Sequence, residues 1–446
     1  MRIKSIIAVI CVLFLCSVLC AQESDPGADT PGGEIDLDQA VVIAVAKSPA
    51  LAASTYGVDI AKFELNKVKK ATNPTVSAST GYTRQGPGSA MMADQKGTVS
   101  GTVSMPIDIT GSFKKAIKAQ TASYDATRFA FETSLCALIY NVKASFFNVL
   151  SKQDQLAVAE SSLAVSKANL EKVQNEVEVG TKPKFDLTRQ EYDVVSREGA
   201  VTASRDAYAQ ALNSFNNLLG VTGSAVYIPK RSDDYFNTSL QGIDPEKDDL
   251  INIALVSRPE VKQANRLVEG QDLYIDVVKG KYLPSFSVSG SYNKQLLETD
   301  INGKYSWNAM ANLAIPIFSG GIAKDEVASA EAAKAQADSS RLGIMQSVST
   351  EVMNALLALN TSRDQINTCQ KAVDLAREAQ EIAQLRYDEQ LGTFLDVQTA
   401  MDNTFSAENN LIAAKYAYII NIYNLEKALG RQREIDSLVS ELWEEE

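Results

Sequence analysis

The chain has 446 residues, a net charge of −12 and no histidine. The lack of histidine excludes Ser-His-Asp and Cys-His catalysis and histidine-ligated metal sites, so we expect neither an enzyme nor a cofactor. The acidic balance argues against a nucleic-acid partner and against binding to anionic membrane surfaces.

The first 21 residues have the pattern of a secretory signal peptide. Arg2 and Lys4 precede an apolar run over residues 6–19, and Ala21 closes a cleavage site. The alternative is a lipoprotein signal acylated at Cys20, which is disfavoured because the residue before it is a leucine. No later segment has the run of about 18 apolar residues that a membrane helix needs. We therefore predict an exported protein.

The rest of the chain resembles itself at a fixed shift of 210 residues. Proline and glycine fix backbone geometry, so their coincidence at this shift indicates two copies of one structural unit. The matched pairs include Pro49 and Pro259, Pro74 and Pro284, Pro106 and Pro316, Gly111 and Gly321, and Gly220 and Gly430. We assign residues 22–220 to the first repeat, 221–249 to a polar linker, 250–430 to the second repeat and 431–446 to an acidic tail. Cys136 and Cys369 do not match at this shift, so two isolated packed cysteines are expected rather than a disulfide.

In chain order, each copy is predicted to contain a helix, a two-stranded hairpin, a very long helix and a return helix. In the first copy these cover residues 37–72, 75–107, 112–179 and 184–219. In the second copy the hairpin covers 285–317 and the long helix 322–389. The linker and the tail are polar and irregular, and we expect them to wrap the outside near mid-height.

Both hairpins alternate between apolar residues and small hydroxylated residues. Val99, Val103 and Ile107, for example, alternate with Ser100 and Thr102. A strand that separates lipid from a hydrated lumen shows this pattern, and so does an ordinary half-exposed hairpin. The segments are about ten residues long, as a tilted bilayer crossing requires, which favours the membrane.

The long helices contain no proline and almost no glycine, and their apolar residues recur at alternating threes and fours. That spacing is typical of a coiled-coil seam. Each helix would be about 100 Å long. The two shorter helices of each copy add up to the same length, so we predict that they stack end to end alongside the long one.

Four strands cannot close a barrel, and open sheet edges are unstable in lipid because their backbone groups stay unpaired. A closed cyclic oligomer is therefore predicted. Two copies would give a barrel filled by its own side chains, whereas three would give an open lumen. The predicted fold is mainly α with β: a membrane β-barrel with four strands per chain, continued by long antiparallel coiled-coil helices that reach about 100 Å from the membrane, a distance on the scale of a periplasm. Such a molecule is a duct.

These features resemble the TolC family of outer-membrane efflux channels over residues 35–430. The resemblance rests on the order, spacing and duplication of Met105-Pro106-Ile107, the segment from Ile315 to Gly321, Glu178-Val179-Gly180-Thr181 with Asp186, Arg386-Tyr387, and the segment from Leu391 to Val397. It implies a homotrimer whose fold is an outer-membrane β-barrel, with four strands per chain, on a long antiparallel α-helical coiled-coil barrel in the periplasm. It also implies outer-membrane lipid, a periplasmic adaptor protein and an inner-membrane pump as partners, with passive conduction of what the pump delivers.

The resemblance places the turns at residues 180–186 and 390–396 at a narrow periplasmic tip. It implies that Asp396 and Thr399 face the pore aperture, where Thr399 replaces the second aspartate of the best-known member. A ring of Asp396 carboxylates would attract cations, and the like charges would raise their pKa. The alternative for Asp396, compatible with this role, is a capping box with Thr393.

The resemblance also implies a latch in which Asp186 hydrogen-bonds Tyr387 across neighbouring coils. The alternative role of Asp186 is to favour the dipole of its own helix. Gly392 stands where the best-known member has a second latch residue, and Gln390 replaces the usual glycine, so we expect the closed state to be held differently. The exposed turns make Gly180, Thr181, Gly392 and Thr393 the predicted adaptor-docking residues, with simple turn geometry as the alternative.

A different reading is a periplasmic or cell-surface coiled-coil scaffold whose hairpins pack in water. It accounts for the signal and the long helices but not for repeated hairpins of lipid-crossing length. The sequence leaves drugs, metal ions and polypeptides open as cargo, since no Met/His-rich stretch marks metal.

Overall fold

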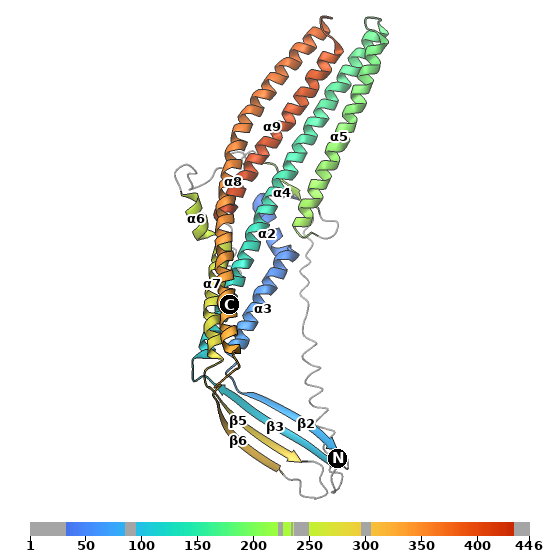
Figure 1. Cartoon of the computed structure of the whole chain (residues 1–446). Helices are drawn as coiled ribbons and strands as arrows, with labels where there is room; N and C mark the ends of the chain where they lie inside the picture. Colours follow the sequence, from blue (N-terminus) through green and yellow to red (C-terminus); the bar gives the residue numbers. More distant parts are fainter. Residues whose placement is uncertain are drawn as a thin grey trace, which may run out of the picture.

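A computed structural model describes residues 33–84, 95–221, 226–232, 235, 249–295 and 305–431. The predicted signal peptide, most of the linker and nearly all of the acidic tail lie outside the described residues. The described chain is elongated, with a β-sheet at one end and a helical tip at the other (Figure 1).

Two helices of 67 residues run along most of the molecule: α4 (Ser112–Glu178) and α8 (Ile322–Asp388). The return helices α5 (Lys184–Leu218) and α9 (Phe394–Leu429) pack beside them in the half nearer the tip. The shorter helices α3 (Pro49–Lys69) and α7 (Pro259–Gly280) pack in the half nearer the sheet (Figure 1). The predicted end-to-end stacking of the shorter helices is therefore present.

The prediction of one helix over residues 37–72 is wrong. Helix α2 (Leu37–Lys47) ends before Ser48, and α3 begins at Pro49 at an angle of 52° to it. The second copy breaks in the same place, between α6 (Leu250–Ser257) and α7. A proline disfavours helical backbone in the residue before it, and it suits the first helical position, so each proline starts a new helix.

The glycine pair of the repeat packs against these two breaks. Gly220 ends α5 with φ 70°, and a Cβ atom there would lie 2.4 Å from the carbonyl oxygen of Lys47. Gly430 ends α9 with φ 67°, and its Cβ would lie 3.0 Å from the backbone nitrogen of Arg258. Both positions need glycine for the left-handed backbone and for the close approach.

The sheet has four antiparallel strands in the order β2-β3-β5-β6. Their bounds are Thr75–Arg84, Gln95–Ile107, Ser285–Gln295 and Tyr305–Ala314. The last strand ends three residues before the predicted end of the hairpin, ahead of Pro316, which lacks the N–H to continue a ladder. A short parallel pair, β1 (Glu34–Ile35) with β4 (Ile228–Pro229), joins the start of the first repeat to the linker and was not predicted.

The largest core cluster lies at mid-height, where α2, α4, α5 and α9 meet. Phe146 contacts the rings of Phe147, Phe215 and Tyr235 edge-on. Both body cysteines are free, as expected, and burial raises the pKa of Cys136 to about 12. Its thiol is therefore inert at neutral pH.

Candidate functional site

The two faces of the sheet differ in chemistry along every described strand. The register pairs Val76 with Val103, Met105 with Val288, and Phe286 with Leu313, so one face is apolar from β2 to β6. The remaining large apolar members of this face are Val99, Ile107, Tyr82, Tyr292, Tyr305 and Trp307, and Lys294 lies on the same face opposite Tyr305. Among the described residues of the single chain, no layer packs on this face.

The opposite face consists mainly of serine, threonine and asparagine. Thr75 and Ser104 share a hydrogen bond of 2.8 Å between their hydroxyls, and Ser79 and Ser100 share one of 2.6 Å. Asn308 accepts a hydrogen bond from a serine hydroxyl on the neighbouring strand β5. A face lined with small hydroxyls suits contact with water, so the sheet separates an apolar environment from a hydrated one.

Aromatic residues gather on the apolar face at the end away from the helices. Tyr292 and Trp307 lie opposite each other in the register, and the Tyr305 ring stacks on that of Tyr292 at 6.3 Å. The side chain of Trp307 is 73% exposed in the single chain. Aromatic side chains at one edge of an apolar band are typical of a strand end at a membrane surface.

Among the described residues, neither flank of the molecule packs against a further element, either in the sheet or along the helices. The edge strands β2 and β6 are exposed along their described length. Among the helices, α4 packs between α3 and α7 nearer the sheet and between α5 and α9 nearer the tip, while α8 lies at the other flank (Figure 1). One flank therefore carries β2, α3 and α5, and the other carries β6 and α8.

The flank helices expose apolar stripes. On α8 the stripe comprises Leu342, Met353, Leu357, Leu375, Ile382 and Leu385. At 3.6 residues per turn these positions fall within about a quarter of the helix circumference. Helix α8 also contains an 18-residue window apolar enough to cross a membrane by composition, yet only 22% of that window is buried in the chain. On the other flank, α3 exposes Tyr56, Ile60 and Phe63, and α5 exposes Phe185, Tyr192 and Val195.

Two tight turns form the tip. Gly180 has φ 83°, and Gln390 has φ 60°, a left-handed conformation that a non-glycine residue adopts at a cost of about 1–2 kcal/mol. Of the predicted docking residues, Gly180, Thr181 and Thr393 are exposed and Gly392 is partly buried. The two turns thus present their predicted docking residues at the end of the molecule (Figure 1).

Asp396 and Thr393 form the predicted capping box at the start of α9. The Thr393 backbone N–H donates to the Asp396 carboxylate at 2.9 Å, and the Asp396 N–H donates to the Thr393 hydroxyl at 3.3 Å. The backbone N–H and the hydroxyl of Thr393 lower the pKa of Asp396 below its ordinary 3.8, so this carboxylate is charged at neutral pH. Asp396 and Thr399 are both exposed. The expected rise of the pKa needs neighbouring carboxylates, which a single chain does not supply.

Tyr387 is 8% exposed and contacts the turn of the first hairpin. The ammonium of Lys182 lies 3.7 Å from the centroid of its ring and 2.8 Å from the Glu176 carboxylate. The Tyr387 hydroxyl is buried and makes no hydrogen bond to Asp186 among the described residues, so the latch predicted across neighbouring coils stays a prediction. Burial lowers the pKa of Lys182, but Glu176 and Tyr387 raise it by more, and the side chain remains a cation.

A further contact joins the hairpin α4–α5 to the hairpin α8–α9 near the tip, and sequence reasoning missed both this contact and that of Lys182 with Tyr387. Lys172 of α4 makes an ion pair of 2.7 Å with Asp388 of α8. Lys182 lies in the turn of the first hairpin, whereas Tyr387 lies at the end of α8. A lysine within the turn itself is the one signal that could have marked Lys182.

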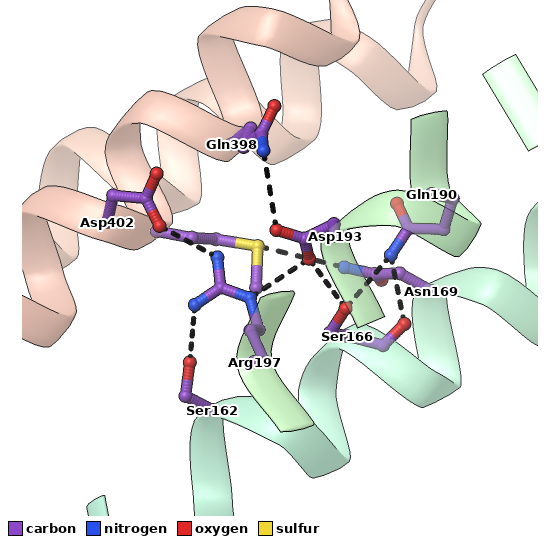
Figure 2. A network of polar contacts seen from close by, with 9 residues as sticks. Ser162, Ser166, Asn169, Gln190, Asp193, Arg197, Gln398 and Asp402 are labelled. Carbon is purple, nitrogen blue, oxygen red and sulfur yellow. Dashed lines mark hydrogen bonds and ion pairs between the residues drawn. The ribbon is translucent and has the colours of Figure 1, made fainter. Parts of the chain in front are cut away.

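A buried polar network joins the same hairpins between the tip and mid-height (Figure 2). Arg197 of α5 donates to Asp193 at 2.9 Å, to Ser162 of α4 at 2.7 Å and to Asp402 of α9 at 3.1 Å. The side chains of Arg197 and Asp193 are 7% and 4% exposed. Ser166 of α4 also donates to Asp193, at 2.5 Å. A buried pair satisfied by three helices fixes their relative register, because any slip leaves a charge unpaired.

A family model described as Outer membrane efflux protein matches residues 40–221 and 250–431. The two matched ranges are offset by 210 residues, the distance of the internal repeat. The model therefore matches once in each copy and covers most of the chain.

Named relatives and solved structures agree with this match. The cation efflux system protein CusC of Escherichia coli (strain K12) is 24% identical over 332 residues, 73% of this chain and 71% of the relative. A CusC crystal structure superposes with a TM-score of 0.78 at 22% identity, covering 89% of this chain and 92% of that one. The Campylobacter jejuni CmeC outer membrane channel superposes with a TM-score of 0.74 at 19% identity, covering 91% and 88%.

These similarities agree with the two-faced sheet and the long helices, and they leave no support for a water-packed scaffold. The chain belongs to the outer membrane efflux protein family and is an outer-membrane exit duct for efflux that extends into the periplasm.

Proposed function

We propose that three copies of this chain close into one duct that crosses the outer membrane and passively conducts what an inner-membrane pump delivers. The observation that carries the proposal is the pair of unlike, unpaired flanks. One flank ends in β2, α3 and α5 and the other in β6 and α8. Each flank of one copy can therefore pack against the opposite flank of a neighbouring copy. Unlike flanks make head-to-tail contacts, which close into rings.

The sheet supports three copies over two. Three sheets of four strands give a barrel wide enough to hold water, and the hydroxyl-lined face suits that lumen. The apolar face, with Trp307 and Tyr292 at its outer end, then contacts outer-membrane lipid. The apolar stripe of α8, including Leu357, packs against α3 and α5 of the next copy.

The tip supplies the gate and the docking surface in this proposal. Asp396 and Thr399 line the aperture, and the contact of Lys182 with Tyr387 holds the hairpins together, with Asp186 retained as a predicted latch residue. A periplasmic adaptor protein docks at the exposed turns around Gly180, Thr181, Gly392 and Thr393. The adaptor connects the duct to its pump.

The mass of the detergent-extracted protein tests the assembly. Native mass spectrometry of the outer-membrane fraction is expected to give three copies. Leu357→Lys, which places a charge in the α8 stripe, is expected to weaken the trimer by about 2 kcal/mol or more per interface, the value of one buried leucine. Ser347→Lys is the control, because Ser347 is exposed on α8 outside the stripe.

A single copy or a pair in the wild-type extract would contradict the closed trimer. A trimer that survives Leu357→Lys as well as it survives Ser347→Lys would instead show that the α8 stripe is not the interface.

A further inference from the structure

Lysines gather where the sheet meets the helices, in a chain whose net charge is −12. We call this group the lysine collar. It comprises Lys67, Lys69 and Lys70 at the end of α3, Lys114, Lys115 and Lys118 at the start of α4, Lys279 and Lys281 at the end of α7, and Lys324 at the start of α8.

Only part of the collar is neutralised within the chain. Lys67, Lys115 and Lys281 form ion pairs with Glu64, Asp276 and Glu326. The other six side chains are exposed and make no hydrogen bond or ion pair with the described residues: Lys69, Lys70, Lys114, Lys118, Lys279 and Lys324. Asp108, Asp325 and Glu331 also lie near this level and form no ion pair with the described residues, but they are fewer than the six lysines. The collar therefore leaves a local positive charge on an acidic molecule.

The helix dipole favours a lysine at only half of these six positions. Lys69 and Lys279 lie at helix C-termini, where a cation is favourable, but Lys114 and Lys324 lie in the first turns of α4 and α8, where it is unfavourable. The 210-residue shift maps Lys69 onto Lys279 and Lys114 onto Lys324. Both copies thus place lysines at the same level of the molecule, at helix C-termini and at helix N-termini alike.

That level directly follows an exposed apolar belt. Ile317 and Phe318, between β6 and α8, are 95% and 88% exposed, and Ile315 beside them is 58% exposed. The belt continues the apolar face of the sheet toward the helices. Cations next to the end of a lipid-facing band lie at the depth of lipid headgroups.

A groove of about 480 Å³ between α7 and α8 brings two collar lysines together. Lys279 and Lys324 line it with Tyr282, above Ala323 and Val327. Its remaining lining residues are Ala328 and Glu331. Two ammonium groups against the single carboxylate of Glu331 leave the groove with a net positive charge beside a mainly apolar floor. This arrangement fits a phosphodiester with its glycerol and the upper part of its acyl chains.

We infer that this groove binds an anionic phospholipid of the periplasmic leaflet, with Lys279 and Lys324 on the lipid phosphate. The inference rests on the proposed function, since it needs the sheet to lie in the outer membrane. The net charge of the whole chain argued against binding to anionic membrane surfaces. Exposed charges, however, act only within a Debye length of about 8–10 Å. The lysine collar, rather than the net charge, therefore determines whether an anionic lipid binds at this level.

Lipid binding to the detergent-extracted complex tests the inference. Native mass spectrometry is carried out with phosphatidylglycerol and with phosphatidylcholine of the same acyl chains. Phosphatidylglycerol is expected to bind more tightly, and Lys279→Gln with Lys324→Gln to weaken it roughly 30-fold at low salt, at about 1 kcal/mol per lysine. The matched control is Lys184→Gln with Lys371→Gln, two exposed lysines far from the sheet. It is expected to bind phosphatidylglycerol like the wild type.

Three results would overturn the inference while the complex stays assembled: equal binding of the two lipids, unchanged phosphatidylglycerol affinity in Lys279→Gln/Lys324→Gln, or displacement of the lipid by inorganic phosphate at equal concentration and constant ionic strength. An extract without any assembled complex would instead contradict the proposed function.

Discussion

Gly220 shows what a repeated glycine does at the level of atoms. Its φ is 70°, and a Cβ would lie 2.4 Å from the carbonyl oxygen of Lys47. We expect Gly220→Ala to destabilise the protein by more than the roughly 1–2 kcal/mol of left-handed backbone strain, because the clash is with main chain. The measurement is the thermal midpoint followed by circular dichroism.

Gly57→Ala is the matched control for this substitution. Gly57 lies within α3, and a Cβ there would meet nothing within 4 Å. Alanine at that helical site is expected to stabilise by about 0.5–1 kcal/mol. Equal midpoints for Gly220→Ala and Gly57→Ala would contradict the packing argument.

Local residue chemistry could be predicted from the sequence, and contacts between hairpins could not. The capping box of Thr393 and Asp396 spans three residues, so the motif alone indicates it. Lys182 and Tyr387 are separated by 205 positions, and nothing local shows that they meet. The resemblance places a latch on Tyr387 with Asp186 as its partner, and that latch stays a prediction.

Among the secondary-structure elements, strand β3 offers a direct test of the two faces of the sheet. Val103 lies on the apolar face and Thr102, its neighbour, on the hydroxyl face. We expect Val103→Arg to block assembly in the outer membrane, because arginine at the lipid midplane costs about 2–4 kcal/mol in each copy. Thr102→Arg is expected to assemble. The measurement is the amount of trimer in the outer-membrane fraction, and equal assembly of the two variants would refute the assignment of faces.

The strands and long helices were predictable because each carries a sustained period. Sequence reasoning failed where an element is too short to show one. The two-residue strands β1 and β4 carry no period at all. The break at Ser48 was missed because helical spacing continues on both sides of it, and only the geometry before Pro49 reveals the 52° bend.

At the scale of the whole molecule, duplication gives the chain a layer of helices and strands with two unlike flanks. The repeat supplies two hairpins to one sheet, but it leaves β2 and β6 as open edges. The need for closure was therefore predictable from four strands per chain. Which helices form each flank became visible only in the structure, because it depends on how α3 and α5 stack along α4 (Figure 1).

In the proposed duct, opening depends on the contacts between hairpins at its tip. The buried network around Arg197 holds the hairpins together farther from the tip, so we expect movement to concentrate at the tip itself, where Lys182 covers the ring of Tyr387. A desolvated cation–π contact contributes up to about 2 kcal/mol, so Lys182→Met is expected to raise the open population up to roughly 30-fold while keeping the apolar stem. Single-channel conductance in planar bilayers measures this. Lys184→Met, an exposed neighbour, is the control and is expected to conduct like the wild type. If Asp186→Asn raises conductance and Lys182→Met does not, the latch is the one expected from the sequence and forms only in the assembled ring.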